Sequence, residues 1–140
     1  MTTDQLPNRI SATIIPEVEQ MDFLPSLFGE HLMLRGEAMI FGWMRRLSED
    51  YQGGVWNFYR CSNNALFMAP KSEKHFHISV NTNGFTGDLS AEGAGIVANL
   101  FALCHLSEQT EDDSIIQHYH LLRDYALDHA EASQILSAID

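Results

Sequence analysis

Residues 90–106, SAEGAGIVANLFALCHL, decide the fold, because they predict one helix that is apolar on nearly every side. Asn99 is the only strongly polar residue near the middle of this helix. A helix that is apolar all round must be covered on all sides. Ser90 is suited to cap the helix, and Glu92 places a negative charge near the positive end of the helix dipole. We therefore predict a buried helix at the centre of the protein.

Two glycines in the first turns of this helix predict a close crossing with another element. Gly93 and Gly95 each lower the helix propensity by about 1 kcal/mol relative to Ala, so their use is steric. We expect the backbone of a strand or a helix to approach there. The apolar stretch is shorter than the roughly 20 apolar residues of a membrane span. It is therefore predicted to be a core helix.

The length and composition favour one globular domain, residues 1–140. The chain has 140 residues, the size of an ordinary domain, and its hydrophobic content of 45% excludes disorder. No stretch has the pattern of a secretory signal. The two cysteines, Cys61 and Cys104, have the spacing of neither a disulfide framework nor a metal site. A cytoplasmic protein is expected.

The charge balance is strongly acidic. Nineteen Asp and Glu residues against eight Lys and Arg residues give a formal net charge of −11. This argues against a basic nucleic-acid groove, so we expect no strong direct binding of nucleic acid. The opposite interpretation is an acidic surface that mimics DNA. Most of the acidic residues are scattered along the chain, which disfavours mimicry but leaves it open as an alternative.

The N-terminal third predicts an edge strand and two helices. Residues 1–20 contain Pro7 and Pro16 and predict an arm or an edge strand, since proline cannot donate to a central ladder. Residues 22–29 predict a short helix that ends at Gly29. Residues 30–49 predict an amphipathic helix. Its expected apolar stripe consists of Leu34, Ala38, Phe41, Met44 and Leu47.

The middle of the chain predicts a small antiparallel sheet of three to four strands. Apolar residues alternate with a period of two, as in half-buried strands. The predicted segments are a hairpin of residues 56–61 and 65–69, a third strand at 75–81, and a fourth strand or extended approach at 85–89.

The third strand has the clearest alternation. Phe76, Ile78 and Val80 point to one side, and His75 and His77 point to the other. Antiparallel sheets often have one buried and one solvated face. The two histidines are therefore predicted on the solvated face.

Two helices are predicted near the C-terminus. Residues 114–128 predict an amphipathic helix capped by Ser114, and a last helix is expected to begin at Asp128 with Glu131 in a capping-box position. Strands flanked by helices, without repeated βαβ units, indicate an α+β fold. We expect N-terminal and C-terminal helices to pack with the sheet around the buried helix 90–106.

The candidate chemistry is sparse. His75 and His77 could share a metal ion, but the nearby sequence supplies no third ligand. His118 and His120 lie about 200° apart on a helix, so they form no common site. Cys61 and a strand histidine could pair as nucleophile and base, although a chain with seven histidines offers such a pair by chance. We assign no catalytic, cofactor-binding or metal residue, and a small metal- or thiol-dependent enzyme stays an alternative.

A series of short motifs runs along nearly the whole chain in a characteristic order. They include Phe23-Leu24-Pro25, Arg35-Gly36-Glu37-Ala38, Trp43-Met44, Phe58-Tyr59, Met68-Ala69-Pro70, Asn83-Gly84-Phe85, Leu89-Ser90-Ala91, Leu122-Arg123-Asp124-Tyr125-Ala126 and Ala138-Ile139-Asp140. In order and spacing, these motifs resemble the ArdB/KlcA family of antirestriction proteins, which plasmids and other mobile elements carry.

The resemblance implies an inhibitor of type I restriction endonucleases that protects incoming unmodified plasmid, phage or mobile-element DNA. It implies no enzymatic activity, no cofactor, and action by protein interaction rather than DNA mimicry. The expected partner is the type I restriction-modification complex or an associated host factor, not a membrane. We hypothesise that the face near His75 and His77, or the C-terminal end at Asp140, contacts that partner.

Overall fold

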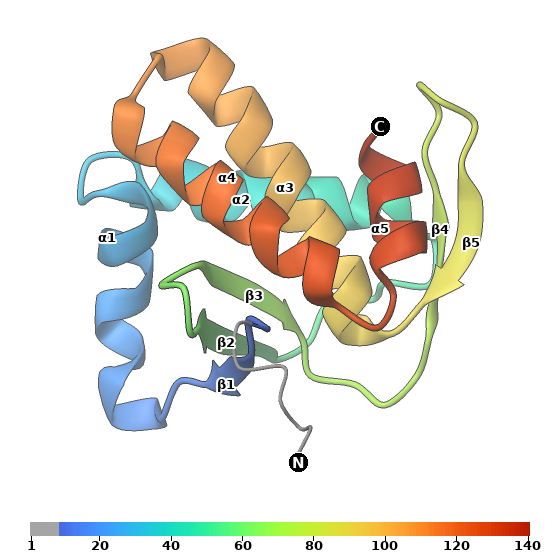
Figure 1. Cartoon of the computed structure of the whole chain (residues 1–140), viewed down its shortest axis with the longest axis horizontal. Helices are drawn as coiled ribbons and strands as arrows, with labels where there is room; N and C mark the ends of the chain where they lie inside the picture. Colours follow the sequence, from blue (N-terminus) through green and yellow to red (C-terminus); the bar gives the residue numbers. More distant parts are fainter. Residues whose placement is uncertain (1–8) are drawn as a thin grey trace.

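The computed structural model describes residues 9–140, which fold into an α+β structure, as the sequence predicts (Figure 1). The elements in chain order are β1 (Ala12–Ile14), the 3-10 helix η1 (Glu17–Asp22), α1 (Phe23–Phe28), α2 (Met33–Leu47), β2 (Trp56–Cys61), β3 (Leu66–Pro70), β4 (Phe76–Ser79), β5 (Thr86–Leu89), α3 (Ala91–Thr110), α4 (Asp113–Asp128) and α5 (Ala132–Ile139).

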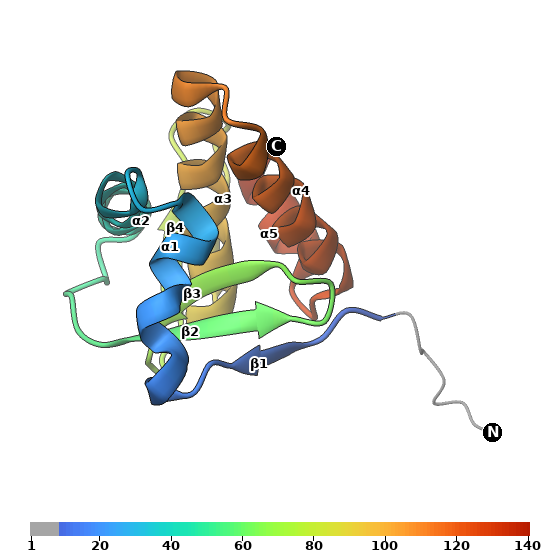
Figure 2. The same cartoon turned by 90° about the vertical axis from the view of Figure 1, so that its left-hand side faces the viewer.

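Helix α3 is the buried axis, as predicted. It lies between α2 on one side and α4 and α5 on the other, and it stands on the sheet that contains β3 (Figure 2). The Ser90 hydroxyl accepts a hydrogen bond from the Gly93 N–H at 3.0 Å, which confirms the predicted N-cap. The helix runs to Thr110, four residues beyond the predicted end. Within residues 9–140, every helix is too short or too polar to cross a membrane.

Strand β3 crosses α3 at Gly95, which confirms the predicted close approach. A Cβ atom at position 95 would lie 2.5 Å from the Ala69 Cβ and 2.8 Å from the Met68 carbonyl oxygen. One turn later, Asn99 binds the same strand. Its Oδ1 accepts from the Met68 N–H at 3.2 Å, and its Nδ2 donates to the Met68 carbonyl at 2.7 Å. The Asn99 amide therefore occupies the edge of β3.

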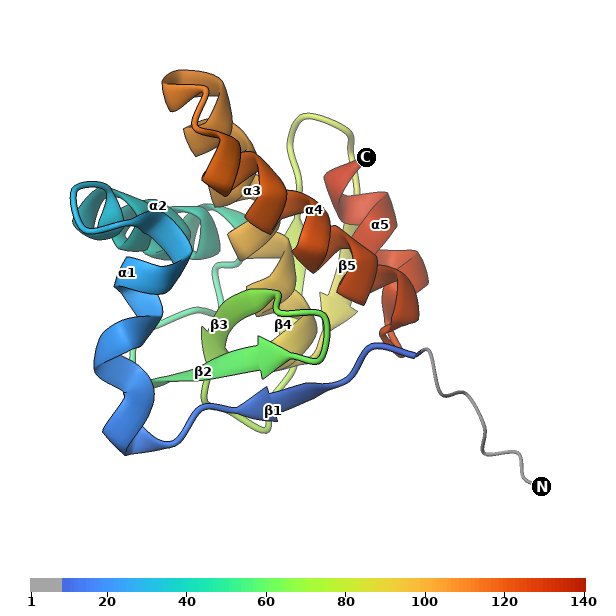
Figure 3. The ribbon, with the colours of Figure 1, turned by 60° about the vertical axis from the view of Figure 1, so that its left-hand side comes forward.

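The five strands form two sheets (Figure 3). Strands β1, β2 and β3 make an antiparallel sheet in which Tyr59 lies opposite Phe67. Strands β4 and β5 pair only with each other, with Ile78 opposite Gly87. The predicted third and fourth strands are both present, but they do not extend the first sheet because the Asn99 side chain has taken the place of a strand beside β3.

The buried side of α2 differs from the predicted stripe. Met44 and Leu47 are buried as expected, but Leu34 is 72% exposed. Gly36 and Ile40 are buried instead. The buried side of α2 is centred on Gly36 because α1 packs against this glycine. A Cβ atom at position 36 would lie 2.5 Å from the ring of Phe28.

The two C-terminal helices start at other residues than predicted. Asp112, not Ser114, caps α4, because its Oδ1 accepts from the Ser114 N–H at 2.9 Å. Helix α5 begins at Ala132, not at Asp128. Asp128 accepts a hydrogen bond from the Ile10 N–H at 2.7 Å, and the Glu131 carboxylate binds Ser90. These tertiary bonds replace the predicted capping box.

Candidate functional site

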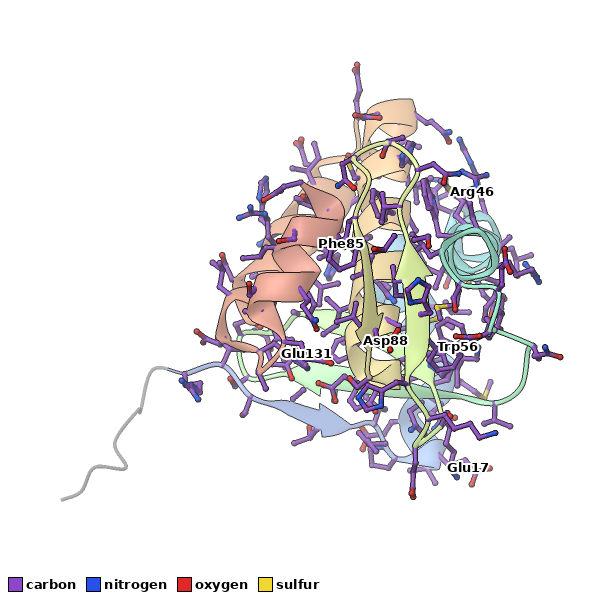
Figure 4. All side chains as sticks on the ribbon, turned by 90° about the vertical axis from the view of Figure 1, so that its right-hand side faces the viewer. Glu17, Arg46, Trp56, Phe85, Asp88 and Glu131 are labelled. Atoms are coloured by element: carbon purple, nitrogen blue, oxygen red, sulfur yellow. The ribbon has the colours of Figure 1, made fainter. Side chains whose placement is uncertain are left out.

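The predicted solvated face of β4 is present. Phe76, Ile78 and Val80 are buried, whereas His75 and His77 are exposed, as the alternation predicts. Strand β4 and its partner β5 form the outer surface between α2 and the C-terminal helices, and the Asp88 side chain projects from this surface (Figure 4).

His77 is held by hydrogen bonds from its ring and from its backbone. Its Nδ1 lies 2.8 Å from Oδ1 of Asp88 across the hairpin, and its backbone N–H donates to Oδ2 of Asp50 at 2.9 Å. The His77 ring is thus oriented by a carboxylate while its side chain stays 56% exposed. The imidazole is therefore fixed in orientation and open to solvent.

Two hollows adjoin this face. One of about 330 Å³ is bordered by His77, Asp50 and Arg46. Another of about 700 Å³ is bordered by His75, Asp50 and Lys71. Both hollows contain acidic and basic side chains, so this face offers polar contacts of either sign.

Asp140 follows the last residue of α5 and takes no part in the contact between His77 and Asp88. Its carboxylate pairs with Arg123 at 3.7 Å. The turn between β4 and β5 is tied to the same helix, because Asn83 Nδ2 donates to the carbonyls of Ser137 at 3.2 Å and Ala138 at 3.0 Å. The structure therefore does not gather His75, His77 and Asp140 into one cluster, but it connects them through the β4–β5 hairpin.

Cys61 is poorly placed to act as a nucleophile. Cys61 is buried, and this burial raises the pKa of its thiol to about 12, with the negative charge of Glu92 adding to the effect. A thiol is a nucleophile only as the thiolate. Within residues 9–140, no three or more His, Cys, Asp or Glu side chains gather as a metal site would require.

A polar cluster that the sequence analysis missed lies at the start of α3. Glu92 Oε2 accepts hydrogen bonds from the Tyr125 hydroxyl at 2.9 Å and from His129 Nε2 at 2.8 Å. The Glu131 N–H donates to His129 Nδ1 at 3.0 Å, so Nδ1 is the acceptor nitrogen and Nε2 carries the proton. We call Glu92, Tyr125 and His129 the Glu92 triad.

The acidities within the Glu92 triad follow from these bonds. The hydrogen bond from His129 lowers the pKa of Glu92, burial opposes this by raising it, and the Tyr125 bond lowers it further. Burial is the main cause of the raised pKa of Tyr125, and the negative charge of Glu92 raises this pKa further. At neutral pH the triad therefore contains a carboxylate at Glu92 and a phenol at Tyr125.

Aromatic packing holds the triad in place. Tyr59 on β2 stacks on Phe67 on β3, with ring centroids 4.6 Å apart, and Phe67 stacks on Tyr125 at 5.7 Å. A hollow of about 460 Å³ opens beside the triad. Its border includes Asn57, Tyr59, Ser72, Glu73, Glu92 and His129.

Only part of this cluster had a signal in the sequence. Tyr125 and His129 are four residues apart, which places them on one side of a helix. From the sequence, Glu92 is explained by the helix dipole and Glu131 by a capping box, because both explanations need only local sequence. In the structure, Glu92 binds Tyr125 and His129 and Glu131 binds Ser90, and these partners lie 33 to 41 positions away in the sequence.

Comparisons with known proteins point to one family. The family model described as "Antirestriction protein" matches residues 49–140. Two Escherichia coli proteins, each named antirestriction protein KlcA, are 47% and 43% identical to the chain, with complete coverage of both proteins in each case. The uncharacterised protein YafX of Escherichia coli K12 is 40% identical over 94% of this chain and 88% of its own length.

A solved structure has the same fold. It covers 100% of both chains with a TM-score of 0.86 and 46% sequence identity. That work describes KlcA and ArdB proteins with a novel fold, active against type I DNA restriction systems in vivo but not in vitro. With the family match and the full-length relatives, this likeness shows that the chain belongs to the ArdB/KlcA family of antirestriction proteins.

Proposed function

We propose that this chain relieves type I restriction inside the cell, in the cytoplasm, and so protects incoming unmodified plasmid, phage or mobile-element DNA. The observation that carries the proposal is the full-length likeness to a KlcA/ArdB structure at 46% identity, since those proteins oppose type I systems in vivo. A TM-score of 0.86 with complete coverage means that the two chains have the same backbone arrangement throughout.

The proposed mode of action is interaction with a protein partner. The structural relative acts in vivo but not in vitro, which favours the need for a cellular component that purified mixtures lack. That component is a host factor associated with the restriction-modification complex, or the complex in its cellular state.

The proposed contact surface is the β4–β5 face with the end of α5. His77 is exposed and oriented by Asp88, and Asn83 ties the hairpin turn to the helix that ends in Asp140. A partner that covers this surface would therefore meet an ordered imidazole and a terminal carboxylate on one continuous edge of the molecule.

The hydrogen bonds of the carboxylates favour protein interaction over DNA mimicry. A mimic needs acidic side chains that present a regular outward array. Several carboxylates instead bind groups within this chain, which favours structural uses for them. These residues are Asp50, Asp88, Glu92, Asp112, Asp128 and Glu131.

The decisive experiment is the plating of unmodified phage on a host with an active type I restriction system. Expression of the wild-type chain should raise the plating efficiency while methylation of host DNA stays intact. His77→Ala and Asp140→Ala should each lower this gain. Both side chains are exposed, so the variants should change stability by no more than about 0.5 kcal/mol.

Glu108→Gln is the matched control, because Glu108 is an exposed carboxylate on α3 outside the proposed surface. Full antirestriction by both surface variants would contradict the contact surface but not the function. No rise in plating with folded wild-type protein would contradict the function itself. A purified cleavage assay with and without cell extract then tests whether a host component is needed.

A further inference from the structure

We propose that the hollow beside the Glu92 triad binds an organic cation, namely a guanidinium or a primary ammonium group. This site is bordered by β2, the loop after β3 and the start of α3, and its border does not include His75, His77 or Asp140. The proposal does not depend on the function proposed above.

The first argument is that hydrogen bonds fix one oxygen of the Glu92 carboxylate and leave the other available. Both of its triad hydrogen bonds go to Oε2, from Tyr125 and from His129. No residue within the described range 9–140 donates to Oε1. Since 30% of the Glu92 side chain is exposed, a ligand can reach the carboxylate without displacing its two donors.

The second argument is the border of the hollow. Besides Glu92 it carries a second carboxylate, Glu73, and the polar side chains of Asn57, Tyr59 and Ser72. Among the described residues, no Lys or Arg borders it. Two carboxylates on a border that holds no Lys or Arg side chain repel anions and attract cations.

The third argument is size and aromatic character. The hollow is open to solvent, and its volume of about 460 Å³ leaves room for a guanidinium or ammonium group. Tyr59 borders the hollow, and burial raises the pKa of its hydroxyl, which therefore stays protonated. An aromatic ring beside a carboxylate is a common setting for guanidinium and ammonium groups.

The same geometry favours binding over catalysis. Both ring nitrogens of His129 are engaged, Nε2 by Glu92 and Nδ1 by the Glu131 N–H. The lowered pKa of Glu92, caused chiefly by the His129 hydrogen bond, makes it a weak base. The site can therefore orient a cation but has no group poised to transfer a proton.

The test is an NMR titration of the purified full chain at constant ionic strength. One arm uses N-acetyl-arginine methylamide, which represents an arginine side chain of a protein, and the other uses spermidine, a free polyamine. The expected result is a saturable shift of amide signals at residues 57–59, 72–73, 90–92 and 129. The arm that saturates at lower concentration identifies the source of the cation.

Two variants and their matched controls make the test specific. Glu92→Gln should weaken binding at least tenfold, whereas Glu108→Gln removes the same charge from an exposed part of α3 and should leave binding unchanged. Glu73→Arg places a competing guanidinium at the border, and its control is Glu108→Arg. Glu73 is exposed, so this pair decides the outcome if Glu92→Gln fails to fold.

Localised shifts that Glu92→Gln and Glu73→Arg weaken, and that both Glu108 variants retain, would support the cation site. Three results would overturn it. These are shifts spread over the acidic surface, equal binding by each variant and its Glu108 control, and no saturation with either probe.

Discussion

The Glu92 carboxylate shows how hydrogen bonding and burial compete at one residue. Hydrogen bonds to His129 and Tyr125 favour the charged form, and partial burial favours the neutral form. The net effect is a lowered pKa, so the hydrogen bonds outweigh the burial. The charge of Glu92 therefore stabilises the folded protein, whereas an isolated buried carboxylate would destabilise it.

This balance predicts an acid-dependent loss of stability. Because the folded pKa of Glu92 lies below the usual 4.5, its contribution is complete above that pH. It is lost as the pH falls through the lowered folded value. Urea unfolding of the wild type and of Glu92→Gln from pH 7 to pH 3 should show a free-energy difference that shrinks towards the acid end. A difference that is constant with pH would contradict the assigned hydrogen bonds.

At the residue scale, local patterns were sufficient for some features and not for others. The Ser90 cap and the exposure of His75 and His77 could be predicted, since each depends on neighbours within a few positions. The meeting of Glu92 with His129 depends on how α3 packs against α4. No periodicity in a single chain encodes that contact.

Among the elements, the crossing of α3 and β3 depends on the absence of a side chain at Gly95. Gly95→Ala should lower the free energy of unfolding by about 1–3 kcal/mol, the usual cost of overpacking. The new Cβ would meet the Ala69 Cα at 2.7 Å and the Met68 carbonyl at 2.8 Å, and backbone cannot move aside cheaply. Chemical denaturation of the two proteins measures the difference.

Gly42→Ala is the matched control for this prediction. Gly42 also lies in a helix, α2, but a Cβ there would meet nothing within 4 Å. The substitution should raise the free energy of unfolding by about 1 kcal/mol through helix propensity. Effects of the same sign in both variants would rule out the crossing as the cause.

Element types were easier to predict than their partners. The strands at 76–79 and 86–89 follow from alternation, but their separation into a second sheet does not. The deciding group is the Asn99 amide, which satisfies β3 in place of a further strand. In a similar way, α5 starts at Ala132 because Asp128 and Glu131 bind Ile10 and Ser90.

For the whole molecule, the net charge of −11 is a source of self-repulsion. Raising the NaCl concentration from about 10 mM to about 500 mM shortens the Debye length from roughly 30 Å to less than 10 Å. The melting temperature should therefore rise over this range, as differential scanning calorimetry can measure.

The control is a triple variant, Glu73→Gln, Glu108→Gln and Asp124→Asn, whose sites are all exposed. It should show a smaller salt-induced rise because three of the repelling charges are gone. A melting temperature that falls with salt in the wild type would mean that attractive ion pairs, such as Arg123 with Asp140, dominate instead.

The Asn99 amide and the shortness of β1 together close both edges of the three-stranded sheet. On one edge, Asn99 binds the free backbone groups of Met68. On the other, β1 is only three residues long, and Pro16 follows two positions later. Short edge strands and proline prevent strands of other molecules from adding to a sheet. Within the described residues 9–140, the three-stranded sheet thus offers no free strand edge on which another chain could add.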